Sequence, residues 1–126
     1  MIFLVLALLT VQSRPAQVPP RVSAGAPSET KPMYRELQPG EERVDALLQR
    51  IECPPGKPVT FVLKRKDGVG KYQAPRLDAV DYISHNSRVG SHIGCGGFTP
   101  APRVYLTWKT VSNAPRVVAV EFLPDK

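Results

Sequence analysis

The sequence predicts a mainly β fold, a small antiparallel barrel of about five strands of the OB-like or SH3-like type, with a two-sheet β-sandwich as the alternative. Three observations predict it. Residues 58–65, PVTFVLKR, alternate so that three large apolar side chains share one face of a strand. Asp67 and Gly68 then form a hairpin signal. The closing segments 103–109 and 116–124 are rich in β-branched and aromatic residues, and a turn separates them.

The first ten residues, MIFLVLALLT, are apolar except for the last. This run is too short for a membrane-spanning helix, which needs about 20 apolar residues, and it fits the apolar centre of a secretory signal peptide. We therefore expect a signal-peptide-like segment at 1–13 and no transmembrane span. A buried N-terminal strand or helix is the alternative.

The next segment, 14–40, is rich in proline and poor in large apolar residues. Proline removes backbone donors and biases its neighbours toward extended conformations, and the segment has too little apolar surface to offset the entropy of ordering. The sequence therefore predicts a disordered Pro-rich linker. Met33, Tyr34 and Leu37 are its candidates for docking on the domain that follows.

The pattern of residues 40–53, GEERVDALLQRIEC, fits two structures. Four apolar residues recur at helical spacing: Val44, Leu47, Leu48 and Ile51. A strand fits as well, because Leu47, Ile51 and Cys53 then share a face and a bulge near Leu48 would bring Val44 and Ala46 into register. Strand and helix both stay open for 44–53.

The remaining elements follow in a simple order. A Pro-Pro-Gly turn at 54–57 precedes the hairpin, and 71–74 form its short return strand. Residues 76–85 predict a strand or a short helical turn, and 86–102, rich in Gly, Ser, Asn and Pro, predict a long loop. Two strands, a short third strand, an irregular excursion and two closing strands are typical of a small barrel, so the β domain covers 41–126.

The chain carries a net charge of +6 and has a pI of about 9.6, so its surface attracts anionic partners. If the protein is exported, we expect its binding partner to be an anionic component of the cell envelope or another protein. Nucleic acid is the partner only under an alternative, in which an OB-like barrel binds it through Lys64, Arg65, Lys71 and Tyr72. Two other aromatic residues, Phe61 and Trp108, share faces with leucines and are expected in the core.

Four short motifs are IEC at 51–53, LDAV at 77–80, GCG at 94–96 and VAVEF at 118–122. Together they resemble an uncharacterised small β domain that lies at the C-terminal end of bacterial secreted and tetratricopeptide-type proteins. The resemblance covers about residues 41–126. It implies a fold and paired cysteines, and it implies no activity.

Cys53 and Cys95 are the two cysteines of the chain. In an exported protein two thiols are usually oxidised to a disulfide. The glycines on either side of Cys95 let a loop approach a strand closely. We expect a Cys53–Cys95 disulfide that stabilises the small domain by about 4 kcal/mol.

Two other roles for Cys95 stay open. A zinc ion would take two nitrogens and two sulfurs from Cys53, His85, His92 and Cys95, although only the last two are closely spaced. A Cys95 nucleophile would use His85 or His92 as its base, but no family-specific cysteine signature surrounds it. The disulfide is the favoured role of the two cysteines, so we predict no catalytic residue, no metal and no cofactor, with the zinc site and the nucleophile as alternatives.

Carboxylates add no catalytic pair, and Glu121 is expected to face solvent or to meet Arg103 or Lys109 across the sheet. The sequence thus predicts an exported, non-enzymatic, disulfide-braced β module, secreted or periplasmic, that acts as a binding or structural domain in the cell envelope. The alternatives are an OB-like nucleic-acid-binding domain and a small cysteine-dependent enzyme.

Overall fold

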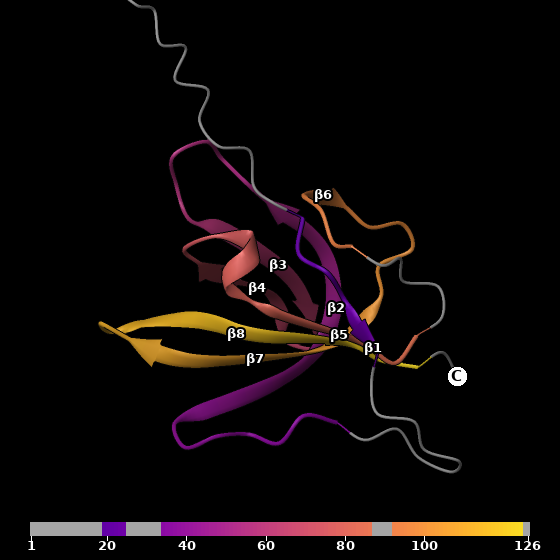
Figure 1. Cartoon of the computed structure of the whole chain (residues 1–126), viewed down its shortest axis with the longest axis horizontal. Helices are drawn as coiled ribbons and strands as arrows, with labels where there is room; N and C mark the ends of the chain where they lie inside the picture. The colour runs from indigo at the N-terminus through magenta and orange to yellow at the C-terminus, as the bar shows by residue number, and fades with distance from the viewer. Residues whose placement is uncertain (1–18, 25–33, 87–91, 125–126) are drawn as a thin grey trace, which may run out of the picture.

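The computed structural model describes residues 19–24, 34–86 and 92–124. Within them the chain forms strands, one short 3-10 helix and no α-helix (Figure 1). The elements are β1 (Ser23–Ala24), β2 (Glu41–Glu52), β3 (Val59–Arg65), β4 (Gly68–Ala74), η1 (Leu77–Ala79), β5 (Asp81–Ser84), β6 (Gly96–Gly97), β7 (Arg103–Val111) and β8 (Ala114–Phe122). The prediction of a mainly β fold is confirmed.

The N-terminal segment predicted to resemble a signal peptide, 1–13, lies outside the described residues. In the part of the chain that the structure describes, no helix has the length and apolar character needed to cross a membrane.

The described strands belong to one eight-stranded sheet in which five strands form a ring. Around the ring β2 pairs with β3, β3 with β4, β4 with β8, β8 with β7, and β7 with β2 again. The contact between β4 and β8 is parallel and rests on one pair, Gln73 and Arg116. Outside the ring, β5 lies parallel to β8 and β1 lies parallel to β5. The sheet is therefore mixed, which corrects the prediction of a purely antiparallel arrangement. The long connection from β5 to β8 permits the parallel pairing.

Residues 44–52, whose pattern fitted both a helix and a strand, belong to the long strand β2. Ala46, Leu48 and Ile51 are buried, whereas Leu47 is 38% exposed. The register with β3 shifts between Leu48 and Arg50, so a bulge adds one residue there. Because of the bulge, the buried residues Leu48 and Ile51 are three positions apart instead of two, which explains the helix-like spacing. The prediction that Leu47 shares the face of Ile51 is wrong, because Leu47 precedes the bulge.

Two tight hairpins organise the ring. The predicted one joins β3 to β4, and Gly68 follows its turn with φ at +129°, a conformation that favours glycine. The other joins β7 to β8, which lie side by side in Figure 1. Its turn residues Ser112 and Asn113 both have positive φ, as a type I′ turn requires. Between the hairpins, 76–85 contains both predicted alternatives in succession, η1 and then β5.

The apolar core includes residues from every strand of the ring and from β5. Its largest fully buried side chains include Tyr82, Phe61, Phe122, Leu48, Ile51, Leu63, Leu77 and Leu106. The expected core position of Phe61 is confirmed. Trp108 is partly buried and packs against the same cluster.

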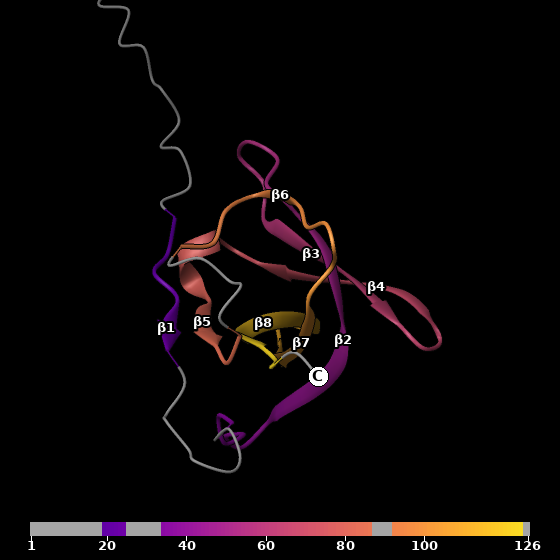
Figure 2. The same cartoon turned by 90° about the vertical axis from the view of Figure 1, so that its right-hand side faces the viewer.

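Two parts of the predicted linker 14–40 lie on the domain. Val22 is buried, and β1 pairs with β5 (Figure 2). Tyr34 packs edge-on against two aromatic rings of the domain, as its expected docking role requires, whereas Leu37 is exposed. The structure thus differs from the prediction of disorder at 19–24 and 34–40. Met33 and the rest of the linker lie outside the described residues.

Candidate functional site

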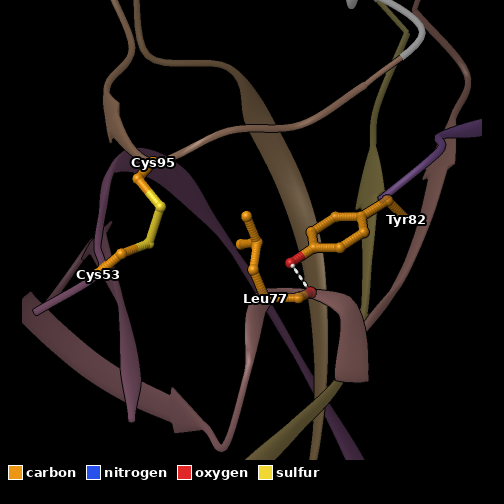
Figure 3. The surroundings of a disulfide bond; sticks show 4 residues. All are labelled: Cys53, Leu77, Tyr82 and Cys95. Atoms are coloured by element: carbon orange, nitrogen blue, oxygen red, sulfur yellow. Dashed lines mark hydrogen bonds between the residues drawn. A yellow bond between two sulfur atoms is a disulfide. The ribbon is translucent and has the colours of Figure 1, made fainter. Parts of the chain in front are cut away.

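Cys53 and Cys95 form a disulfide with a Cα–Cα distance of 5.9 Å, which confirms the predicted pairing (Figure 3). Cys53 directly follows β2, and Cys95 directly precedes β6. Gly96 lies opposite Ile51 of β2 and has φ at +116°, so the loop pairs with the strand in a conformation that L side chains rarely adopt. The bridge and the short strand β6 together fasten the long loop to β2.

Leu77 and Tyr82, two buried residues of the core cluster against which Cys53 packs, lie in the surroundings of the disulfide (Figure 3). The hydroxyl of Tyr82 donates a hydrogen bond of 2.9 Å to the carbonyl oxygen of Leu77. Burial raises the pKa of Tyr82, and the charge of Asp78 adds to the effect. This phenol therefore acts as a neutral donor that fixes η1 against β5.

The disulfide bears directly on the zinc and nucleophile alternatives. Both require a thiolate, and a sulfur bonded to another sulfur is not one. His85 instead binds Glu121 through Nε2, and the backbone of His92 forms an isolated bridge with Arg21. Among the described residues, no group of three His, Cys, Asp or Glu side chains is arranged to hold a metal.

The four predicted binding residues all lie on the β3–β4 hairpin, but only two are exposed. Lys64 and Lys71 face solvent. Arg65 donates from Nη1 to the hydroxyl of Tyr72 at 3.0 Å and forms an ion pair with Asp67 at 3.2 Å. Tyr72 is only 8% exposed, so it offers no open ring for base stacking.

Arg65 and Tyr72 approach closely because Gly70 lies beside them. A Cβ atom at this position would come within 3.2 Å of both side chains. The glycine-containing stretch 68–71, which has no phosphate-loop spacing, therefore serves the packing of the hairpin. The four residues predicted from the sequence thus share one hairpin, but Tyr72, expected to offer its ring to a ligand, is buried.

A groove of about 860 Å³ lies where β2 changes its pairing partner. Residues 41–47 of β2 pair with β7, whereas 47–52 pair with β3 on the opposite edge. The groove is lined by Val44, Asp45, Ala46, Leu47, Lys64, Arg65, Lys66, Asp67 and Arg103. It thus opens between the first half of β2 and the tip of the β3–β4 hairpin.

A second cluster, which sequence reasoning missed, surrounds the carboxylate of Glu121. This side chain on β8 is fully buried. Its Oε2 accepts a hydrogen bond from the backbone N–H of Arg35 at 2.9 Å and lies 3.0 Å from Nε2 of His85. Its Oε1 lies 3.5 Å from Nη2 of Arg43. The prediction that Glu121 faces solvent or meets Arg103 or Lys109 is therefore wrong.

Residues 34–38 cover this carboxylate. The ring of Tyr34 packs edge-on against His85, with centroids 4.9 Å apart, and against Tyr105 at 5.1 Å. Arg43 also donates from Nη2 to the carbonyl oxygen of Arg35. One sequence signal was available: 116–124 is an almost continuous apolar run, which is typical of a strand buried on both faces.

The same covering segment is held by an ion pair between Arg35 and Glu41. The guanidinium donates two hydrogen bonds, of 2.6 and 3.0 Å, to the carboxylate, and the N–H of Gln38 donates another at 2.8 Å. The Arg35 hydrogen bonds, helped by Gln38, lower the pKa of Glu41 from 4.5 to about 2. Because folding lowers this pKa, the ionised Glu41 stabilises the folded state at any pH above its unfolded-state pKa of 4.5. This stabilisation is lost as the pH falls through the folded-state pKa of about 2.

Replacing Glu41 by Gln should therefore destabilise the protein by about 1 kcal/mol at neutral pH, a figure that allows for partial solvent screening. The difference between wild type and variant should shrink as the pH falls from 4.5 toward about 2. Urea unfolding of both proteins across this range measures it. If the difference in unfolding free energy does not change with pH, the pKa of Glu41 is the same in the folded and unfolded states, and the Arg35–Glu41 ion pair does not stabilise the fold as predicted.

Comparison of the chain with protein-family models, with characterised proteins and with solved structures finds no match in any of the three.

Proposed function

We propose that the chain is an exported, non-enzymatic binding module of the cell envelope, in which a disulfide braces a small β domain on a Pro-rich tether. The observation that carries this proposal is the Cys53–Cys95 disulfide. Disulfides persist in secreted and periplasmic proteins and are rare in the reducing cytosol. The resemblance to a domain of bacterial secreted and tetratricopeptide-type proteins supports the same compartment.

The fold in this proposal is an OB-like or SH3-like barrel. The five-strand ring with its apolar interior supports it, since small barrels fill their interior with inward-facing side chains. The single residue pair between β4 and β8 agrees with the partly open ring of an OB-like barrel.

Binding, and not catalysis, is the role that the polar residues support. Glu121 and His85 are buried and bind one another, so neither is presented to a substrate. The exposed polar surface is instead cationic at the β3–β4 hairpin, where Lys64, Lys66 and Lys71 face solvent. We call these three residues the cationic hairpin. An anionic envelope component or another protein is its proposed partner.

Cell fractionation tests the proposed compartment. A bacterial host that makes the full chain should place it in the periplasmic or secreted fraction, with both cysteines resistant to alkylation until a reductant is added. A control chain without residues 1–13 should stay in the cytosol. Recovery of both chains from the cytosol with reactive thiols would contradict export.

Binding measurements separate the proposed role from the nucleic-acid alternative. Immobilised anionic envelope polymer and a single-stranded oligonucleotide are compared as ligands for the purified chain. Preferential retention by the polymer is expected, with loss on K64E/K71E. Stronger, salt-sensitive binding of the oligonucleotide would instead favour the nucleic-acid reading.

A further inference from the structure

Residues 20–24 of the predicted linker bind two separate segments of the domain. β1 lies parallel to the second half of β5, as Figure 2 shows. Just before β1, Arg21 forms an isolated antiparallel bridge with His92. The N–H of Ile93 donates a hydrogen bond of 3.2 Å to the carbonyl oxygen of Pro20. We call the site that this segment occupies the strand slot; β5 and the pair His92 and Ile93 are its two walls.

Both walls of the strand slot are held by contacts that do not involve residues 20–24. β5 pairs with β8 along its whole length. Ile93 lies two positions before Cys95, which the disulfide joins to Cys53, and β6 pairs with β2 directly after the bridge. These contacts preform the slot, and a preformed site binds an extended segment with a smaller loss of conformational entropy.

Residues 20–24 are held in the slot mainly by one side chain. Val22 is 9% exposed and belongs to the core cluster, which also contains Val80 and Ile93. The other four residues are exposed or partly exposed, and β1 pairs over only two residues. A segment with so few buried contacts opens at a small cost in free energy compared with global unfolding. The segment can therefore leave the slot while the ring of five strands stays folded.

A groove of about 610 Å³ lies beside the strand slot. Its charged lining residues are Arg21, Arg35, Asp78 and Asp81. Arg35 forms an ion pair with Glu41. Asp78 forms another with Arg76. Asp81 on β5 is exposed and opposite in charge to Arg21, which is exposed as well. The groove therefore favours a basic residue directly before the buried valine of the bound segment.

We propose that the strand slot binds an extended peptide segment of a partner protein, which adds to β5 as a strand in place of residues 20–24. The partner segment places a β-branched apolar residue at the position of Val22, with a basic residue before it. Its backbone pairs with β5, and the buried apolar position and Asp81 give specificity. The inference goes beyond the proposed function, because the strand slot shares no residue with the cationic hairpin.

The chain's own segment competes with the partner for this slot. A tethered segment has an effective concentration of about a millimolar. A second copy of the chain offers the same segment without this advantage, so exchange between copies is disfavoured at micromolar protein concentration. A partner protein displaces residues 20–24 by binding more tightly, and its apparent affinity rises when the chain's own segment is weakened.

The test uses the full-length oxidised chain and the synthetic peptide PPRVSA, which repeats residues 19–24. Val22→Asp places a charge at the buried position and releases the chain's own segment from the slot. Ser23→Pro removes a backbone donor from β1 and releases the segment with Val22 intact. Amide chemical shifts of the protein measure the affinity for the peptide and locate it.

We expect PPRVSA to bind both variants with a dissociation constant of about 1 mM or lower, because the same sequence occupies the slot at an effective concentration of about a millimolar. The largest shifts should lie in β5 and at Ile93. The wild type should bind the peptide at least about tenfold more weakly, since its own segment competes. Val69→Asp makes the same exchange at an exposed residue of β4 and should behave like the wild type. The peptide PPRDSA should bind neither variant detectably.

Absence of PPRVSA binding to both variants in the millimolar range would overturn the strand slot as a binding site. Equal affinity of the wild type and the two variants would do so too, as would equal binding of PPRDSA or shifts that map away from β5 and Ile93. Wild-type dimers that form at micromolar concentration and are absent from both variants would assign the slot to a second copy and overturn a partner protein as its occupant. These failures leave the exported binding module intact, since fractionation and polymer binding test that proposal separately.

Discussion

Replacing Cys53 and Cys95 together by serine should lower the free energy of unfolding by about 4 kcal/mol. The bridge joins residues 42 positions apart, and the loop it closes contains β3, β4, η1 and β5. In the unfolded chain this cross-link removes much of the loop's conformational freedom, so its loss favours unfolding. Small domains have a total stability of only about 5–15 kcal/mol. Urea unfolding of wild type and variant measures the difference.

Reductant supplies the matched control for this prediction. It should lower the stability of the wild type to that of the C53S/C95S chain and leave the variant unchanged. If the variant is unfolded without urea, the same comparison is made in a stabilising osmolyte such as trimethylamine oxide. A loss below about 1 kcal/mol would show that the bridge constrains the domain far less than its loop length predicts.

Glu121→Ala should destabilise the protein by about 3 kcal/mol. The carboxylate is fully buried and accepts the N–H of Arg35, and it also pairs with His85 and Arg43. Truncation removes the acceptor of the Arg35 N–H and the partner of the His85 ring in an enclosed site, while Arg43 keeps the carbonyl oxygen of Arg35 as an acceptor. Glu121→Gln keeps one oxygen for Arg35 and should be less damaging. Chemical denaturation of the variants gives the free energies.

Asp45→Asn is the matched control, because Asp45 forms a bidentate pair with Arg103 at the surface. Exposed pairs contribute about 0–1 kcal/mol, so this variant should be nearly as stable as the wild type. Hydrogen exchange adds a local measurement: the Arg35 amide should exchange slowly in the wild type and quickly in Glu121→Ala. Equal losses in the two variants would contradict a special role for the buried carboxylate.

The local elements of the fold could be predicted because their signals are local. The Asp67-Gly68 pair sets the β3–β4 hairpin, and the alternation of 58–65 sets its buried face. The disulfide followed from the cysteine count together with the expectation of export. These inferences needed no knowledge of which strands lie side by side.

The buried Glu121 could not be found in this way. Its cover comes from residues 34–38, and Arg35 lies 86 positions away in the sequence. That cover belongs to a segment whose proline content predicted disorder. The strand interpretation of the sequence also placed a bulge near Leu48, but only the pairing of β2 with β3 shows that the bulge follows Leu48 and so leaves Leu47 exposed. The surroundings of Glu121 and the exposure of Leu47 therefore depend on contacts between residues far apart in the chain. A single sequence does not show which of these residues lie side by side.

The central claim is that the chain is exported and carries the Cys53–Cys95 disulfide. Intact mass spectrometry of the protein, purified from its native host and alkylated without reductant, tests this claim most directly. The expected result is a chain that lacks the apolar N-terminal residues, carries no alkyl group and is two hydrogens lighter than its reduced form. Recovery of a chain that keeps residues 1–13 and carries alkyl groups on both Cys53 and Cys95 would contradict export and bracing together.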